Sequence, residues 1–220
     1  MSQVKVVRQR PDRVMATSPS SRRQAGDVPT RGTGPFVILG LVASTGGPRA
    51  LSQVLGALPS AFPLPILVVQ HITSSFLEGF ASWLGTVCPF PVSLAQDFEI
   101  ARPGRVYLPP ADLHLRVEQG RLRWDRGEPV CIQRPSGTIL FRSMANTLGK
   151  GALAVLMTGM GEDGAEGLAE VRAAGGHTIA EDASTAVVNG MPGAAVFRGA
   201  ACEVLPLPDI AARLLDLTRG

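Results

Sequence analysis

The sequence predicts an α/β fold: a doubly wound, mainly parallel sheet with helices on both faces and an added antiparallel β-hairpin. Short runs of consecutive apolar residues recur along the chain, and each leads through glycine or polar residues into a longer segment with helical spacing. This alternation is typical of parallel strands that are covered on both faces. Plentiful glycine and proline with few aromatic residues also suit tight strand-to-helix turns.

The first part of this fold is a βαβ unit. Residues 36–42 and 66–70 are bare apolar runs, which predict strands, and residues 48–58 and 76–84 carry apolar residues at helical spacing. The next region has a different pattern. Between residues 92 and 124, short alternating runs are separated by Pro-Pro and Gln-Gly breaks, and we expect the β-hairpin there.

The parallel sheet resumes after this hairpin. Apolar runs that end in glycine-rich or turn-forming residues alternate again with helical patterns. The predicted elements are a helix at 138–148, a strand at 153–158, a helix at 165–174, a strand at 177–180, a turn-rich piece ending at 190–192, a strand at 202–205 and a helix at 208–218.

The chain is predicted to hold one folded domain, residues 35–220, after a basic tail or linker at residues 1–34. The tail has few large apolar residues at any regular period, so it cannot offset the entropy of ordering and is expected to be disordered. An organelle transit peptide is the alternative interpretation of this Arg-rich leader. The tail carries seven Lys and Arg against two Asp, a net charge of +5, which leaves −2 for the domain out of the total of +3.

Charge and cysteine usage exclude several classes of protein. Because the basic charge belongs to the tail, it gives no reason to expect nucleic-acid binding by the domain. Cys88, Cys131 and Cys202 are odd in number and scattered, which fits neither a disulfide framework nor a C-x-x-C motif and favours a reducing cytoplasm. Since no apolar run approaches the ~20 residues that span a bilayer, we expect a cytoplasmic protein without membrane insertion.

Three reactive side chains follow three predicted parallel strands. Ser44 comes after the strand at 36–42, His71 directly after 66–70, and Asp163 shortly after 153–158. In open α/β sheets, ligand sites collect at the carboxyl ends of the strands, near the point where the strand order reverses. We therefore expect these side chains to converge although they are far apart in the sequence.

Their residue types suit nucleophilic catalysis. The glycines after Ser44 permit a sharp turn that exposes its hydroxyl, and the N–H groups of Thr45 or Gly46 face the same space and can stabilise an oxyanion. His71 can accept the serine proton near neutral pH, and Asp163 can fix the histidine tautomer. Each residue also has a simpler interpretation: Ser44 caps the following helix or binds phosphate, His71 is a structural hydrogen-bonding residue, and Asp163 caps the helix after it.

The other histidines are expected to be non-catalytic. His114 lies in the predicted hairpin, and with Asp112 it forms a pair too sparse for a metal site, while His177 begins a strand. We therefore predict no metal site.

Four segments in order give the chain a resemblance to the catalytic domain of the CheB family, the bacterial chemotaxis protein-glutamate methylesterases, over about residues 36–218. They are GLVASTGGP at 40–48, VQH at 69–71, LMTGMGEDG at 156–164 and NGMP at 189–192. The resemblance implies that Ser44 is the nucleophile, His71 the general base and acid, and Asp163 the residue that orients His71, with Met160 lining the oxyanion region.

The resemblance also implies the reaction. Methyl-esterified glutamates on the cytoplasmic helices of chemoreceptors would be the substrate, and some relatives also deamidate receptor glutamines. No metal or organic cofactor is needed, because serine, imidazole and oxyanion donors supply the required groups. Family members generally carry an N-terminal receiver domain. The tail is too short to form a receiver domain, so we expect the catalytic domain only. Its activity should then be regulated differently from that of family members with a phosphorylated receiver domain.

A smaller departure from the family pattern lies at Gly137-Thr138, where many relatives have a larger residue and an Asp. We expect this difference to alter receptor contacts without touching the triad. Two alternative functions remain: an anion-binding module that performs no acylation, and a receptor-binding regulatory module descended from the enzyme that has lost turnover. The sequence does not predict the oligomeric state.

Overall fold

The computed structural model describes Met1 and residues 35–219, and the predicted tail lies outside the described residues apart from Met1. A seven-stranded sheet forms the middle layer, in the order β3-β4-β2-β1-β7-β8-β9, and every neighbouring pair in it is parallel. The strands are β1 (Ile38–Ala43), β2 (Ile66–Gln70), β3 (Val92–Leu94), β4 (Val106–Leu108), β7 (Ala152–Leu156), β8 (His177–Glu181) and β9 (Glu203–Leu205). The predicted doubly wound fold is confirmed.

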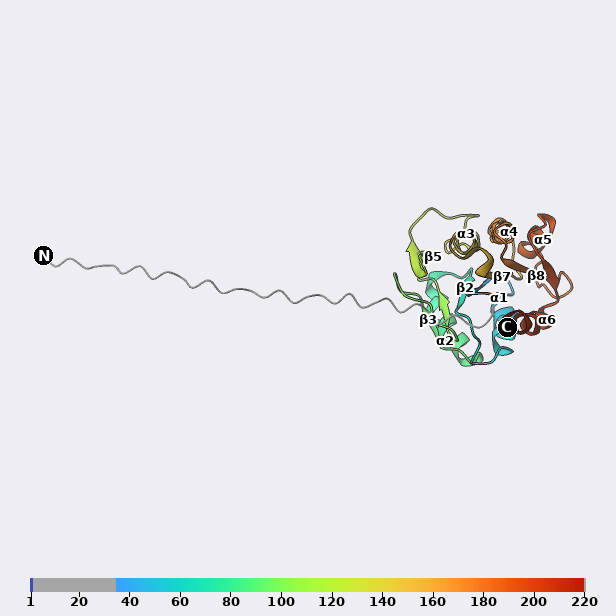
Figure 1. The fold of residues 1–220 in the computed structure, drawn as a ribbon, viewed down its shortest axis with the longest axis horizontal. Helices are drawn as coiled ribbons and strands as arrows, with labels where there is room; N and C mark the ends of the chain where they lie inside the picture. The colour runs from blue at the N-terminus through green and yellow to red at the C-terminus, as the bar shows by residue number, and fades with distance from the viewer. Residues whose placement is uncertain (2–34, 220) are drawn as a thin grey trace.

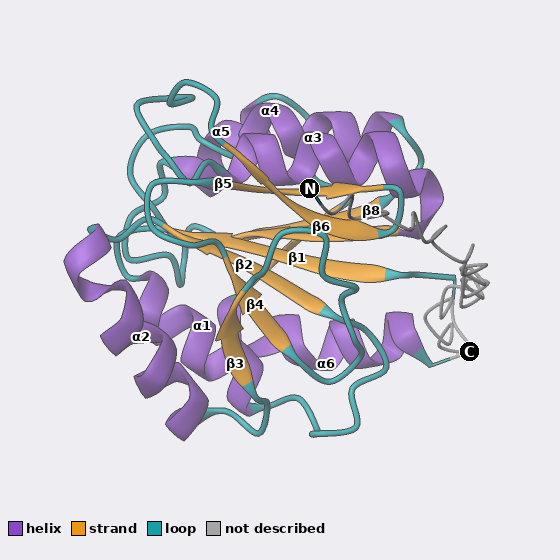
Figure 2. Cartoon of the chain, turned by 90° about the vertical axis from the view of Figure 1, so that its left-hand side faces the viewer, coloured by secondary structure: helices purple, strands orange, loops and turns teal. Residues whose placement is uncertain are grey.

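Helices cover both faces of the sheet (Figure 1, Figure 2). One face carries α1 (Gly47–Gly56), α2 (Ser74–Val87) and α6 (Leu207–Thr218), and the other carries α3 (Gly137–Leu148), α4 (Ala165–Ala173) and α5 (Met191–Phe197). The two apolar cores lie between these layers. In β1, for example, Leu39 and Leu41 belong to the first core, while Ile38 and Val42 belong to the second.

The predicted hairpin forms a separate two-stranded antiparallel sheet of β5 (His114–Glu118) and β6 (Arg121–Asp125). Its apolar side chains Leu115, Val117 and Leu122 pack into the core beside α3. The runs that precede it belong elsewhere: β3 and β4 join the edge of the main sheet in parallel. All three residues of β4 are buried, which suits a strand within the main sheet better than a half-exposed hairpin strand.

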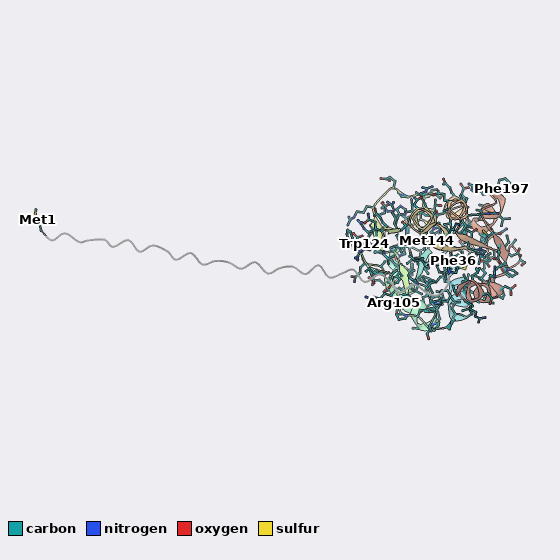
Figure 3. All side chains as sticks on the ribbon, in the orientation of Figure 1. Met1, Phe36, Arg105, Trp124, Met144 and Phe197 are labelled. Atoms are coloured by element: carbon teal, nitrogen blue, oxygen red, sulfur yellow. The ribbon has the colours of Figure 1, made fainter. Side chains whose placement is uncertain are left out.

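Most predicted elements lie within a few residues of their expected positions, but α5 is a helix where a turn was predicted. The Gly-Met-Pro sequence predicts the end of a turn, whereas Pro192 stands in the first turn of α5, a position where its missing N–H costs nothing. Phe197 at the end of this helix is 90% exposed and lies at the margin of the molecule, while Met144 of α3 is buried (Figure 3).

Strand order reverses between β1 and β7. From β1 the chain runs through α1 to β2 on one side, and from β7 it runs through α4 to β8 on the other. Because α1 and α4 cover opposite faces, the loops after β1 and β7 border a crevice at the carboxyl ends of these strands, the usual place of ligand sites in such sheets. These loops lie at the left in Figure 2.

No helix of residues 35–219 combines the length and apolar character that crossing a bilayer requires. Within the same residues, no group of three or more His, Cys, Asp or Glu side chains is arranged to hold a metal ion.

Candidate active site

The structure brings the loops that carry Ser44, His71 and Asp163 to the crevice where the strand order reverses. The three strands that precede them, β2, β1 and β7, are neighbours in the sheet. The loops are also joined by main-chain hydrogen bonds. Ser44 donates its N–H to the carbonyl of Thr158 at 2.9 Å, and His71 donates its N–H to the carbonyl of Ala43 at 3.1 Å.

The turn that carries Ser44 is tightly fixed. The Ser44 carbonyl accepts hydrogen bonds from the Gly47 N–H at 2.8 Å and from the Gln70 side-chain amide at 2.9 Å. Gly46 has φ of +81°, a left-handed conformation that favours glycine, and a Cβ at Gly47 would overlap the Gln70 side chain. The glycines therefore serve the sharp turn predicted from the sequence.

Gly159 fits the same turn from the opposite side. A Cβ built on Gly159 would come within 2.8 Å of the Ser44 Cβ, and its main chain bonds to Val188, Gly190 and Met191. Any side chain at this position would push against Ser44 or its loop.

His71 and Asp163 form a direct contact, with 2.8 Å between the histidine Nε2 and the carboxylate Oδ2. Their side chains are 6% and 2% exposed, so water screens this pair little. Burial alone would raise the pKa of Asp163, but hydrogen bonds from His71 and Ser136 outweigh it and lower the pKa below its usual 3.8. The carboxylate is thus ionised at neutral pH and only accepts hydrogen bonds.

This geometry fixes the histidine tautomer. An ionised carboxylate can only accept a hydrogen bond, so the Nε2 of His71 must carry the proton that it donates to Asp163. The other ring nitrogen, Nδ1, then has an unshared lone pair. Nδ1 is buried and has no hydrogen-bond partner among the described residues. The imidazole is therefore prepared to accept a proton at Nδ1.

The Asp163 carboxylate contacts the N-terminus of α3, although Asp163 itself precedes α4 in the chain. Its Oδ1 accepts hydrogen bonds from the Ser136 hydroxyl at 2.6 Å and from the Thr138 N–H at 3.1 Å, and its Oδ2 accepts from the Gly137 N–H at 2.6 Å. The first-turn N–H groups of a helix have no partner within it, and a carboxylate is well placed there.

The segment Gly137-Thr138, expected only to alter receptor contacts, lies directly against Asp163. Both residues are buried at the start of α3, and both main-chain N–H groups bond to Asp163. The Thr138 hydroxyl also accepts a hydrogen bond from the Gly164 N–H at 2.8 Å, next to Asp163.

The simpler interpretations of Ser44 and Asp163 as helix caps do not hold. Gly46 is the N-cap of α1 and Gly164 is the N-cap of α4, and neither helix has a side-chain cap. Asp163 is turned away from the helix that follows it and toward α3.

The three predicted oxyanion residues directly follow Ser44 or Gly159 in the chain or lie two residues after Ser44. Thr45 and Met160 are exposed, the latter to 72%, and Gly46 is partly buried. Within residues 35–219, their main-chain N–H groups donate to no other protein atom. They are thus free to bind a developing negative charge.

A cavity of about 360 Å³ adjoins the loop that follows Ser44, on the side of α1 and α6. Gly46, Thr158 and Val187 line it, as do Arg49 and Glu181.

His114 and His177, expected to be non-catalytic, make no direct contact with the triad. His177 pairs with Glu203 of β9 at 2.6 Å. His114 is fully buried, and it contacts the triad indirectly, because its Nδ1 accepts a hydrogen bond from the Ser136 N–H at 3.1 Å.

Sequence reasoning missed the parts played by Gln70 and Ser136. Gln70 is the polar end of an otherwise apolar strand, and its amide bonds the carbonyls of both Ser44 and His71. A polar residue at the buried end of such a strand is a usable signal. Ser136 stands directly before the helix at 137–148, which from the sequence alone indicates only an N-cap.

Comparison with known proteins gives one consistent result. Residues 39–214 match the model of a family described as CheB methylesterase. The whole chain aligns at 52% identity with "Protein-glutamate methylesterase/protein-glutamine glutaminase 2" of Paramagnetospirillum magneticum, and 98% of it aligns at 43% identity with "Protein-glutamate methylesterase FrzG" of Myxococcus xanthus. The chain spans 62% and 63% of the lengths of these two relatives.

A solved structure shows the same fold. The crystal structure of the Thermotoga maritima CheB methylesterase catalytic domain matches with a TM-score of 0.78 and 36% sequence identity, over 83% of this chain and 98% of that one.

Proposed function

The chain belongs to the CheB methylesterase family, and from this premise we propose that it is a serine esterase that hydrolyses glutamate methyl esters on chemoreceptors. The observation that carries the proposal is the buried pair of His71 and Asp163, in which Nδ1 of His71 has no partner among the described residues and the His71 main chain bonds to Ala43, the residue before Ser44. A structural histidine would have both ring nitrogens satisfied, as His114 does.

We assign Ser44 as the nucleophile, His71 as general base and acid, and Asp163 as the residue that orients His71. The Ser44 hydroxyl loses its proton to Nδ1 as its oxygen attacks the ester carbonyl. Asp163 stabilises the imidazolium that forms, and the N–H groups of Thr45, Gly46 and Met160 are the proposed oxyanion donors.

The tetrahedral intermediate then collapses. The proton on Nδ1 passes to the departing methoxide, so methanol leaves and an acyl-enzyme remains on Ser44. Water attacks this ester with His71 again as base, which releases glutamate and the free serine. With an amide substrate the same steps release ammonia, so we propose glutamine deamidation as a second activity, in line with the names of the relatives.

The proposed partners are the cytoplasmic helices of methylated chemoreceptors, which would place the enzyme in the cytoplasm. We also propose that residues 35–220 form the esterase domain and that residues 1–34 are a tail. Methylated receptor membranes therefore provide the direct assay.

The test combines labelling with product release. We expect a fluorophosphonate probe to label the folded protein at Ser44, and the protein to release methanol from methylated receptor membranes. Ser44→Ala should abolish both signals, and His71→Ala should abolish labelling with Ser44 still present. A folded protein that is never labelled would instead favour an anion-binding or receptor-binding module without turnover.

A further inference from the structure

The catalytic carboxylate is held by the start of α3 as well as by His71. Each oxygen of Asp163 accepts two hydrogen bonds: Oδ2 from the His71 ring and the Gly137 N–H, Oδ1 from the Ser136 hydroxyl and the Thr138 N–H. Three of the four donors therefore come from the segment at 136–138. Only one of those three belongs to a side chain, that of Ser136.

We propose that Ser136 is a positioning residue for the catalytic triad: its hydroxyl fixes the rotation of the Asp163 carboxylate and so holds the His71 ring in the orientation that presents Nδ1 to Ser44. This inference rests on the proposed function. It assigns Ser136 no contact with substrate.

The direction of the Ser136 hydroxyl is determined by its surroundings. A hydroxyl has one proton to donate, and its oxygen also accepts a hydrogen bond from the Ile139 N–H at 3.4 Å. Because the ionised Asp163 can only accept, the Ser136 proton lies in the 2.6 Å contact with Oδ1. Hydrogen bonds to an ionised group are stronger than those between neutral groups, so this contact resists rotation of the carboxylate.

Ser136 is itself held in place by His114. The Ser136 N–H donates to His114 Nδ1 at 3.1 Å, so the other nitrogen, Nε2, carries the proton and donates to the carbonyl of Glu128 at 3.1 Å. His114 and Ser136 are fully buried and Asp163 is 2% exposed. A continuous chain of hydrogen bonds thus leads from Glu128 through His114, Ser136 and Asp163 to the catalytic imidazole.

The competing explanation is that Ser136 only caps α3. Ser136 is the N-cap of this helix, and loss of a cap lowers stability without changing the chemistry of a distant group. Two variants separate the roles. Ser136→Ala removes the hydroxyl and the cap, while Ser136→Gly removes the hydroxyl but leaves a residue that is well tolerated at an N-cap.

Ser143→Ala is the matched control. Ser143 is also a buried serine of α3, and its hydroxyl bonds the Val117 N–H and the Leu140 carbonyl rather than Asp163. Loss of this hydroxyl removes buried hydrogen bonds from the same helix without altering the triad.

Two measurements on the full chain test the inference. The first is the rate at which a fluorophosphonate probe acylates Ser44. We expect both Ser136 variants to react more slowly than wild type, by up to about a hundredfold for a misplacement of about 1 Å, and Ser143→Ala to react at the wild-type rate. The second is the ¹⁵N NMR spectrum of the His71 ring, which reports the nitrogen that carries the proton. We expect the Nε2–H tautomer to lose population in the Ser136 variants alone.

The inference requires that Ser136→Gly both slows acylation of Ser44 and lowers the population of the Nε2–H tautomer of His71. It is overturned if acylation matches the Ser143→Ala control, or if the His71 tautomer is the same as in wild type, even where unfolding temperatures fall. A wild-type protein that the probe does not label would refute the proposed esterase. In that case an altered tautomer in Ser136→Gly would still show that Ser136 positions Asp163 and His71, and an unaltered one would refute it.

Discussion

At the scale of single residues, the site depends on which atoms donate hydrogen bonds and which have a free lone pair. One ring nitrogen of His71 makes a hydrogen bond and the other has no partner among the described residues. Asp163 is almost fully buried and accepts four hydrogen bonds. Each such bond to a buried ion is worth about 1.5–3 kcal/mol, so small changes in these side chains have large effects. Three predictions belong to this scale.

Asp163→Asn should lower the rate of ester hydrolysis by about 10⁴-fold, since an amide nitrogen facing His71 favours the wrong tautomer. Steady-state hydrolysis of a chromogenic ester measures this loss. The exposed Asp216→Asn of α6 is the control and should keep the wild-type rate. Wild-type turnover in Asp163→Asn would remove Asp163 from the triad.

Asp163 should also contribute to stability in a pH-dependent way. Its pKa is lower in the folded protein than its usual 3.8, so its contribution is fully present above that value and is lost as the pH falls through the folded pKa. Chemical denaturation of wild type and Asp163→Asn at pH 7 and at pH 3 measures this. We expect the stability gap between them to narrow at the lower pH, and a constant gap would contradict the assignment.

Glu181 should show the opposite dependence. It is 1% exposed, and burial raises the pKa of its carboxyl above the usual 4.5, although hydrogen bonds from Thr158 and Thr185 oppose this. A raised folded pKa favours folding at low pH, and this benefit disappears as the pH rises through that pKa.

Glu181→Gln keeps an oxygen that can accept from the Thr158 N–H without a buried charge. We therefore expect the variant to be more stable than wild type at pH 7, and the difference to shrink below pH 4.5. Denaturation midpoints at the two pH values measure this, with Glu78→Gln on the exposed face of α2 as the control. An equal difference at both pH values would be inconsistent with a raised pKa.

At the scale of elements, close packing of α3 against β1 sets the position of the Asp163 donors. A Cβ built on Gly40 of β1 would lie 2.7 Å from the Met144 sulfur of α3, and one on Gly137 would overlap the Val42 side chain. Both glycines therefore permit the helix to approach the sheet. This approach brings the first-turn N–H groups of α3 to the carboxylate.

Gly137→Ala should destabilise the protein by about 1–3 kcal/mol, because overpacking forces α3 away from β1. Val42→Ala in the same chain should recover part of the loss, which a double-mutant cycle of denaturation midpoints measures. Gly79→Ala in α2 is the control. Its Cβ would meet no atom within 4 Å, so it should raise stability by about 0.5–1 kcal/mol. If Gly137→Ala lowered stability equally in the wild-type protein and in Val42→Ala, this packing argument would be contradicted.

At the scale of the whole molecule, two cores on opposite faces of one sheet support a single site at the reversal of strand order. Among residues 35–219, the members of the two cores run from Phe36 to Leu217. The proposed assignment of residues 1–34 as a tail places them outside this folded unit.

A protein that begins at residue 35 should therefore unfold at the same temperature as the full chain and react with a fluorophosphonate probe at the same rate. Differential scanning calorimetry and labelling kinetics measure the two quantities. A lower unfolding temperature in the shortened chain would show that the first 34 residues belong to the folded domain.

Much of this architecture was predictable because its signals are local. Apolar runs with strand or helix periodicity placed β1, β2, β7 and β8 and their helices, and the residues that follow the strands gave Ser44, His71 and Asp163. Short segments were harder to assign from the sequence. β4 has three residues and α5 has seven, too few for a period to distinguish a strand of the main sheet from a hairpin strand, or a helix from a turn.

The sequence by itself determined the order of the elements and the residues that carry reactive groups, since each depends on neighbours along the chain. Only the tertiary structure decided which nitrogen of His71 faces Asp163, and that Ser136, Gly137 and Thr138 hold this carboxylate from 25–27 positions away. The physical reason is that a buried charge takes its donors from whatever the packing brings within about 3 Å, and no local pattern records that encounter.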